Sequence, residues 1–274
     1  MKVGFYQFRP LFGKVPQNLL KVTSVLRGAD AELVVLPELA FTGYYFRDRN
    51  EVKALAQDTR DSPIIESLRA LCREKRFYIV TGFAEKHLDK CFNSAVLIGP
   101  EGLIHTYRKL HLFNQEQDWF DPGDTPLRVN LVDGARIGIM VCFDWVFPEV
   151  ARVLALEGAD ILCHPSNLVL AHCQKVMLSR CLENRMFAIT ANRFGTDKRP
   201  HGTLKFTGKS QIAGPDGARV FQAPAQRELL YITEIDPGMA RDKHITALND
   251  LMENRRPEFY GELTEGTESI QSSR

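Results

Sequence analysis

Three residues of different chemical types, Glu38, Lys109 and Cys142, each end a short apolar run that is typical of a β-strand. The runs are AELVVLPE, LIHTYRK and RIGIMVC. In α/β sheets, loops gather over the carboxyl ends of strands and form ligand sites there. A thiol, a carboxylate and an ammonium group can together supply a nucleophile, a proton acceptor and a stabiliser of negative charge. The three residues are therefore predicted to form an acyl-transfer site.

The sequence around Cys142, GIMVCFDWVFPE, has the pattern of a strand that turns into a helix within a few residues. Pro148 and Glu149 favour a helix start at this point, and a nucleophile elbow has the same arrangement. A thiol near the positive end of that helix and near a lysine is expected to have a lowered pKa. Taken alone, a free cysteine is more often an inert core residue. The prediction therefore depends on Glu38 and Lys109 as its partners.

The general base is predicted to be a carboxylate. A histidine commonly activates a catalytic cysteine, and His111 and His164 closely follow predicted strand ends. Neither histidine has an obvious orienting acid in the sequence. Glu38 is therefore the better candidate to remove the thiol proton and later to activate water.

The 274 residues carry a formal net charge of +1, with acidic and basic residues interspersed. This balance argues against a nucleic-acid interface, which needs clustered Lys and Arg. No apolar run has the length of a transmembrane helix, and the N-terminal MKVGFYQFRP does not resemble a signal peptide. A cytoplasmic protein without membrane contacts is expected.

The six cysteines are expected to remain thiols in a reducing compartment. The segment CHPSNLVLAHC at 163–173 has four soft metal ligands, so a zinc-binding structural protein is a rival hypothesis. Neighbouring residues on a strand point to opposite faces, which places Cys163 and His164 poorly for a shared metal. No metal is predicted.

Hydrophobic periodicity predicts alternating strands and helices. Strands are expected at 2–8, 32–37, 77–84, 92–98, 103–108, 127–132, 136–142, 159–164, 187–192, 208–213, 218–222 and 229–235, and helices at 16–28, 63–75, 149–157 and 172–185. Turn sequences between some strands indicate antiparallel neighbours, whereas strand–helix–strand units indicate parallel ones. The chain is predicted to form one domain with two packed mixed sheets and helices outside.

Residues 237–274 lose the strand periodicity and become charged. A short helix is expected at 245–253, followed by Pro257 and the pair Phe259 and Tyr260. Two interpretations are evenly weighted. The segment is either a surface tail that frays or an arm that docks on a partner subunit through the two aromatic residues.

The segments LPELAFTGY, YRKLHLF and GIMVCFDWVFPE closely resemble, in order and spacing, the three motifs of the nitrilase superfamily of carbon–nitrogen hydrolases. The resemblance continues through FNSAVLIGPEG, DPGD, HPSNL and RCLENRMFAITANRFG, and so spans most of residues 1–235. It implies an α/β fold that is a four-layer α-β-β-α sandwich, without a metal or organic cofactor. It also implies a homodimer or larger homo-oligomer, with helices 149–157 and 172–185 at the main dimer contact and the tail crossing to the partner.

The resemblance implies a role for each motif residue. Glu38 would be the general base and Cys142 the nucleophile. Lys109 would stabilise the tetrahedral intermediate, helped by the backbone N–H of Phe143.

A second glutamate is expected in the loop after the lysine, where it would hold the geometry of the site. The loop NQEQDWFDPGD offers Glu116 at the expected position, and Asp118 is the weaker candidate.

The residues after the cysteine indicate the substrate class. Aryl nitrilases typically have Trp-Glu there, whereas this chain has Phe143 and Asp144. The motif looks more like the branch that holds small-amide hydrolases, N-carbamoyl-polyamine hydrolases and some thermophile nitrilases. Buried aromatic side chains often serve packing alone, but a narrow aromatic pocket for a small substrate is predicted. Its substrate-binding residues would be Tyr44, Phe143, Asn167, Trp119 and Trp145.

The predicted function is the conversion of a small aliphatic amide or nitrile to a carboxylic acid and ammonia, with the amide slightly favoured. One alternative is hydrolysis of an N-carbamoyl amine, although such enzymes commonly have Cys-Trp-Asp-Gln and a longer loop after the lysine. The other is a non-catalytic relative that serves assembly or supplies ammonia to a partner. The presence of Glu38, Lys109 and Cys142 together argues against a non-catalytic protein.

Overall fold

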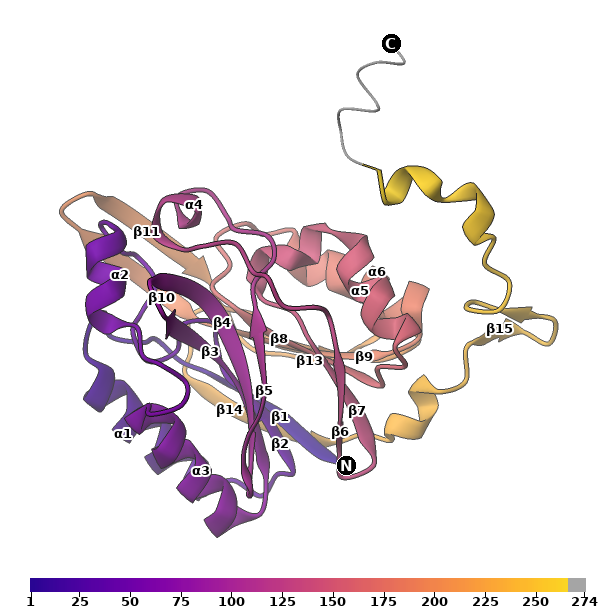
Figure 1. Ribbon diagram of the computed structural model, residues 1–274. Coiled ribbons are helices and arrows are strands. Elements are labelled where there is room, and N and C mark those ends of the chain that lie inside the picture. The colour runs from indigo at the N-terminus through magenta and orange to yellow at the C-terminus, as the bar shows by residue number, and fades with distance from the viewer. Residues whose placement is uncertain (266–274) are drawn as a thin grey trace. The chain divides into compact units, whose positions relative to one another are not determined.

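The computed structural model describes residues 1–265, which divide into two compact units at Arg241 and Asp242. The first unit contains two six-stranded sheets (Figure 1). The first sheet has the order β14-β1-β2-β3-β4-β5, in which β1, β2 and β3 are parallel and the other neighbours antiparallel. Its strands are β1 (Lys2–Gln7), β2 (Leu33–Val35), β3 (Tyr78–His87), β4 (Lys90–Gly99), β5 (Gly102–Arg108) and β14 (Leu229–Glu234).

The second sheet has the order β13-β12-β9-β8-β7-β6. Here β7, β8 and β9 are the parallel strands, and the other neighbours are antiparallel. Both sheets are thus mixed, as predicted. The strands are β6 (Val129–Val132), β7 (Ala135–Ile139), β8 (Ile161–Ser166), β9 (Phe187–Asn192), β12 (Gln211–Ala213) and β13 (Arg219–Gln222).

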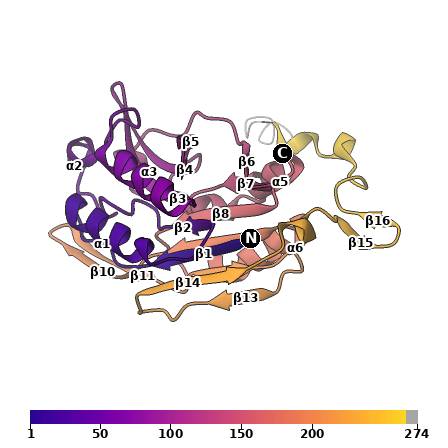
Figure 2. The same ribbon diagram turned by 90° about the horizontal axis from the view of Figure 1, so that it is seen from below.

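Four helices cover the outer faces of the two sheets. α1 (Val15–Arg27) and α3 (Pro63–Lys75) lie on the first sheet, and α5 (Pro148–Leu156) and α6 (Cys173–Asn184) lie on the second (Figures 1 and 2). α3 shows why such helices form: the Ser62 hydroxyl accepts a hydrogen bond from the Ile65 N–H, and Pro63 occupies the first turn. The four-layer α-β-β-α sandwich is confirmed.

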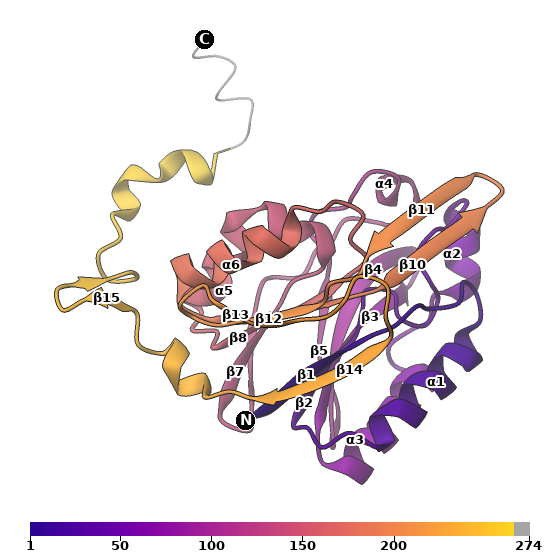
Figure 3. The same cartoon turned by 180° about the vertical axis from the view of Figure 1, so that it is seen from behind.

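Some elements of the fold were not predicted from the sequence. They are α2 (Arg49–Leu55), the single turn α4 (Glu116–Trp119), and a hairpin of β10 (Phe194–Arg199) and β11 (Gly202–Thr207). Figure 3 shows the hairpin extending past the second sheet, on the side of α2 and α4. One apolar cluster joins Val52 of α2, Trp119 of α4 and Phe206 of β11.

The second unit begins at Asp242 and contains a short hairpin of β15 (His244–Thr246) and β16 (Asn249–Asp250). The helix expected at 245–253 is therefore wrong. The Asp250 carboxylate accepts hydrogen bonds from the N–H groups of Met252 and Glu253, which favours a turn at this point. The part of the predicted arm after Glu265 lies outside the described residues.

Among residues 1–265, no helix combines the length and the apolar character that crossing a bilayer requires.

Candidate active site

The three predicted reactive residues converge at the carboxyl ends of strands from both sheets. Glu38 follows β2, Lys109 directly follows β5, and Cys142 follows β7 and opens the 3₁₀ helix Cys142–Val146. β3 passes so close to the Glu38 loop that a Cβ at position 82 would lie 2.3 Å from the Glu38 Cα. Gly82 is therefore needed for the close packing that places Glu38.

Lys109, Glu38 and Glu116 form a fully buried ion cluster. The Lys109 Nζ lies 2.8 Å from Glu38 Oε1, and 2.9 Å and 2.7 Å from the two carboxylate oxygens of Glu116. Burial acts to lower the pKa of Lys109, but the Glu116 and Glu38 carboxylates outweigh it and raise that pKa. The ammonium group is therefore held in its charged form.

Glu116 is positioned by two further donors. The Tyr44 hydroxyl donates to Oε1 at 2.7 Å, and the Phe113 N–H donates to Oε2 at 3.1 Å. Burial raises the pKa of Glu116, opposed by Lys109. Burial and the Glu116 carboxylate together raise the pKa of Tyr44, so the phenol remains a hydrogen-bond donor. The structure thus places Glu116 where the resemblance implied, in contact with the lysine.

Asn93 on β4 is a site residue to which the sequence analysis assigned no role. Its Nδ2 donates to Glu38 Oε1 at 2.7 Å, and its backbone carbonyl accepts from the Lys109 N–H at 2.9 Å. Oε1 of Glu38 therefore has two donors, whereas Oε2 is buried and has no hydrogen-bond partner in the described part of the chain. Asn93 lies in the segment FNSAVLIGPEG, which was part of the resemblance to the nitrilase superfamily. That resemblance was the signal that could have identified it.

The Cys142 thiol sits in a strained backbone turn. Its φ of +43° lies in the left-handed region, which is unfavourable for a residue with a side chain. Burial and, next, the Glu38 carboxylate raise the pKa of the thiol well above its usual range, although Lys109 opposes them. The expectation of a lowered pKa is therefore wrong, because burial and two carboxylates outweigh one ammonium group. The thiol needs a base to remove its proton.

The Asp144 carboxylate holds this turn together from within the protein. Oδ2 accepts hydrogen bonds from the Val141 N–H and the Tyr107 hydroxyl, each at 2.8 Å. Oδ1 contacts His111, at 3.2 Å from its backbone N–H and 2.8 Å from Nδ1. The expectation that His111 lacks an orienting acid is wrong, since Asp144 orients it from 33 positions away in the sequence.

His164 supports the same turn from β8. Its Nε2 donates to the Cys142 carbonyl at 2.9 Å, and its Nδ1 lies 3.2 Å from the Thr190 hydroxyl. Burial lowers the pKa of His164 to about 4, so the ring is neutral at neutral pH. Within residues 1–265, no group of three or more His, Cys, Asp or Glu side chains is arranged to hold a metal ion.

A narrow cavity opens beside the thiol. It has a volume of about 10 Å³, and Cys142 is among its lining residues. Three predicted substrate-binding residues, Phe143, Trp145 and Asn167, also line it, together with Phe113 and the segment 168–170, which were not predicted.

The other two predicted substrate-binding residues, Tyr44 and Trp119, are not among the lining residues of this cavity. They pack edge-on against each other in the apolar cluster with Phe206, at a centroid distance of 6.0 Å. Tyr44 therefore reaches the ion cluster through its hydroxyl, and Trp119 serves packing in this structure.

Comparison with known proteins identifies the family of this chain. The family described as carbon-nitrogen hydrolase matches residues 2–244. A nitrilase from Pyrococcus abyssi is 42% identical over 263 residues, covering 95% of this chain and 99% of that protein. An (R)-stereoselective amidase from a Pseudomonas species is 30% identical over 270 residues, covering 97% and 95%.

The fold is also found in solved structures. A carbon-nitrogen hydrolase from Helicobacter pylori has a TM-score of 0.87 at 23% identity, covering 97% of this chain and 98% of that one. A variant of an amidase from Nesterenkonia, with acrylamide added at its active-site cysteine, has a TM-score of 0.79 at 22% identity, covering 96% and 99%.

The chain therefore belongs to the carbon-nitrogen hydrolase family. It is a hydrolase that acts on carbon–nitrogen bonds other than peptide bonds.

Proposed function

We propose that this protein hydrolyses a small aliphatic amide or nitrile to a carboxylic acid and ammonia, with Cys142 as its nucleophile. The observation that carries the proposal is the buried ion cluster, in which Lys109 and Asn93 bind Glu38 Oε1, while Oε2 has no partner among residues 1–265. A carboxylate oxygen without a partner is available as a proton acceptor.

On an amide, Glu38 takes the thiol proton and the Cys142 sulfur forms a bond to the carbonyl carbon. Lys109 and the Phe143 N–H, which has no acceptor among the described residues, stabilise the negative charge that develops on oxygen. Glu38 then returns the proton to the substrate nitrogen, the C–N bond breaks, and ammonia departs. The acyl group remains on Cys142 as a thioester. Glu38 next deprotonates water, and hydroxide attacks the thioester. The C–S bond then breaks, the acid is released, and Glu38 returns the proton to the Cys142 sulfur.

A nitrile follows the same route with one further step. Attack on the nitrile carbon and protonation of its nitrogen give a thioimidate, to which water adds. Loss of ammonia then gives the same thioester. The site therefore needs no additional group for nitrile hydrolysis.

The cavity beside Cys142 favours a small substrate. Its volume of about 10 Å³ is far below the range of roughly 300–1,000 Å³ that is usual for ligand pockets. Asn167 donates to the Glu38 carbonyl at 2.9 Å, while its Oδ1 is buried without a partner in the described residues. An N–H donor of an amide substrate would satisfy that oxygen.

The likeness to a nitrilase at 42% identity favours a nitrile as the preferred substrate, ahead of the amide that the motif favoured. A panel of short aliphatic and aryl amides, nitriles and N-carbamoyl amines tests the proposal, with ammonia release and product mass as readouts. We expect turnover of short aliphatic substrates, its loss in C142A and weaker turnover of aryl ones. Equal turnover of bulky aryl nitriles, or ammonia release unchanged in C142A, would contradict the proposal.

A further inference from the structure

A second and larger cavity lies next to the cavity that Cys142 lines. It has a volume of about 580 Å³ and is formed by the start of α6, by β11 and β13, and by the segments before β12 and after β13. Val169 lines both cavities, but Glu38, Lys109 and Cys142 do not line this one. The second cavity is thus separate from the catalytic residues.

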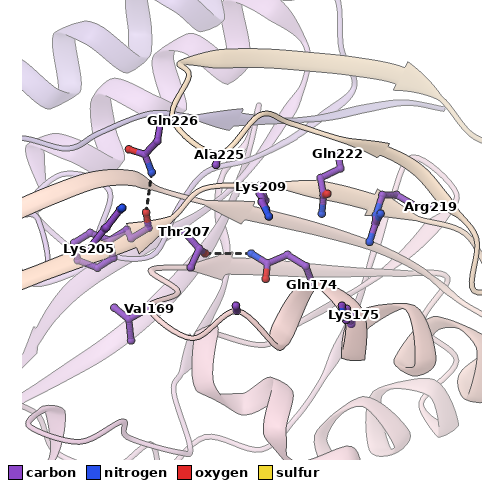
Figure 4. A pocket seen from close by; sticks show the side chains of 12 residues that line it. Val169, Gln174, Lys175, Lys205, Thr207, Lys209, Arg219, Gln222, Ala225 and Gln226 are labelled. Carbon is purple, nitrogen blue, oxygen red and sulfur yellow. Dashed lines mark hydrogen bonds between the residues drawn. The ribbon is translucent and has the colours of Figure 1, made fainter.

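The lining of this cavity has a single sign of charge. Lys175, Lys205, Lys209 and Arg219 contribute to it, and no Asp or Glu is among its lining residues. Figure 4 shows Lys205 at one end, Lys209 near the middle, and Arg219 and Lys175 toward the other end.

The cations of the cavity have no acidic partner within residues 1–265. In the described part of the chain, the three lysines form no ion pair or side-chain hydrogen bond, and Arg219 donates only to the Gln211 amide oxygen, at 3.2 Å. A cleft lined by one sign of charge concentrates counter-ions within it. Like charges placed together without partners favour the binding of an anion.

The floor and walls of the cavity are ordered and partly apolar. Val169, Ala171 and Ala225 contribute apolar surface to the lining, whereas Phe206 is fully buried. The buried Gln174 donates to the Thr207 hydroxyl and the Gly208 carbonyl, each at 3.2 Å. Figure 4 shows the hydrogen bond from Gln174 to Thr207 and the one from Gln226 to the Phe206 carbonyl. An apolar floor between cations suits an organic ligand with anionic ends.

We propose that this cavity binds a small organic anion through carboxylate or phosphate groups. The volume lies within the range that is usual for sites of small molecules, roughly 300–1,000 Å³. The cations at both ends match a ligand with two anionic groups, and Val169, Ala171 and Ala225 would contact its apolar part. The site is independent of which amide or nitrile the catalytic cavity takes.

Calorimetric titration of the full-length protein with glutarate and, separately, with inorganic phosphate tests the proposal at constant ionic strength. The test variant is K175Q/K205Q/K209Q. The matched control is K14Q/K53Q/K90Q, which removes three exposed lysines outside the cavity. Unchanged ammonia release from a short neutral substrate shows that each variant is folded.

We expect saturable binding of at least one probe to the wild type and the control, at least about tenfold weaker in the cavity variant. Tighter binding of glutarate identifies a carboxylate ligand, and tighter binding of phosphate identifies a phosphate ligand. The proposal is overturned if neither probe binds at millimolar concentrations, if the cavity variant binds as the wild type does, or if the control loses binding equally.

Discussion

Lysine side chains occur in two contrasting settings in this protein. Lys109 is fully buried and held by the carboxylates of Glu38 and Glu116. Lys175, Lys205 and Lys209 are exposed around the second cavity, and no acidic side chain lines that cavity. The first setting fixes a charge where a reaction needs it, and the second leaves charges available to a ligand. One residue type thus serves two purposes according to burial and pairing.

The contrast has an energetic consequence. Removing one partner from a buried ion cluster leaves uncompensated charge in a medium of low polarity, which costs about 3–5 kcal/mol. Removing an exposed and unpaired charge usually changes stability by no more than about 0.5 kcal/mol. Substitutions in the two regions should therefore differ in their effect on both stability and activity.

The largest effect is expected for K109M. Loss of the ammonium group leaves Glu38 and Glu116 buried together and removes the stabiliser of the oxyanion. We expect the free energy of unfolding to fall by about 3–5 kcal/mol and kcat/KM to fall about 10³-fold. Urea unfolding and ammonia release measure the two quantities, with K90M as the exposed control. If K109M were as stable as K90M, the ion cluster of Lys109, Glu38 and Glu116 would not contribute to the stability of the fold.

A smaller effect is expected for D144N, which acts on the turn around Cys142. The carboxylate faces donors from Val141, Tyr107 and His111, and an amide group would place its own donor against one of them. We expect stability to fall by about 3 kcal/mol and kcat about 10²-fold, with KM nearly unchanged, since Asp144 is not among the residues that line the cavity beside Cys142. A change confined to KM would contradict a positioning role.

The pH dependence of stability should show the effect of the lowered pKa of His164. Its pKa of about 4 in the folded protein lies below the usual 6.5, so the unfolded chain binds a proton first as the pH falls. Stability from this group is complete above pH 6.5 and is lost on acidification toward pH 4. We expect a loss of about 2 kcal/mol from pH 6.5 to pH 5, absent in H164N and retained in the exposed control H172N. Equal acid sensitivity of both variants would rule out His164 as the cause.

The smallest effect is expected for K175Q/K205Q/K209Q. Because these cations are exposed and unpaired, stability should change by no more than about 0.5 kcal/mol. Turnover of a short neutral substrate should stay within about twofold of the wild type. Thermal unfolding and steady-state kinetics in the absence of added anions measure both. A loss comparable with that of K109M would remove the distinction between the two settings.

The sequence contained strong signals for the sheets and the reactive residues. Apolar runs that end at Glu38, Lys109 and Cys142 marked strand ends from both sheets, and the two sheets bring these ends together. Local periodicity and turn residues were enough for this, because each signal lies within a few positions of the residue concerned.

Other parts depended on contacts between distant segments. The hairpin β10–β11 contains Pro200 and several charged residues, so its strands lacked a clear apolar alternation, yet Phe206 packs on Tyr44. Asp144 and His111 meet only after folding. The raised pKa of the Cys142 thiol follows from burial, which the sequence around an apparent helix start did not reveal.

The central claim is that hydrolysis proceeds through a bond between the substrate carbon and the Cys142 sulfur. Its most direct test is acid quenching of the protein during turnover of the best substrate in the panel, followed by mass analysis of the peptide that contains Cys142. We predict a mass increase equal to the acyl group on that peptide alone, although the chain has six cysteines. Turnover without an adduct, or an adduct on another cysteine that persists in C142A together with ammonia release, would contradict the account.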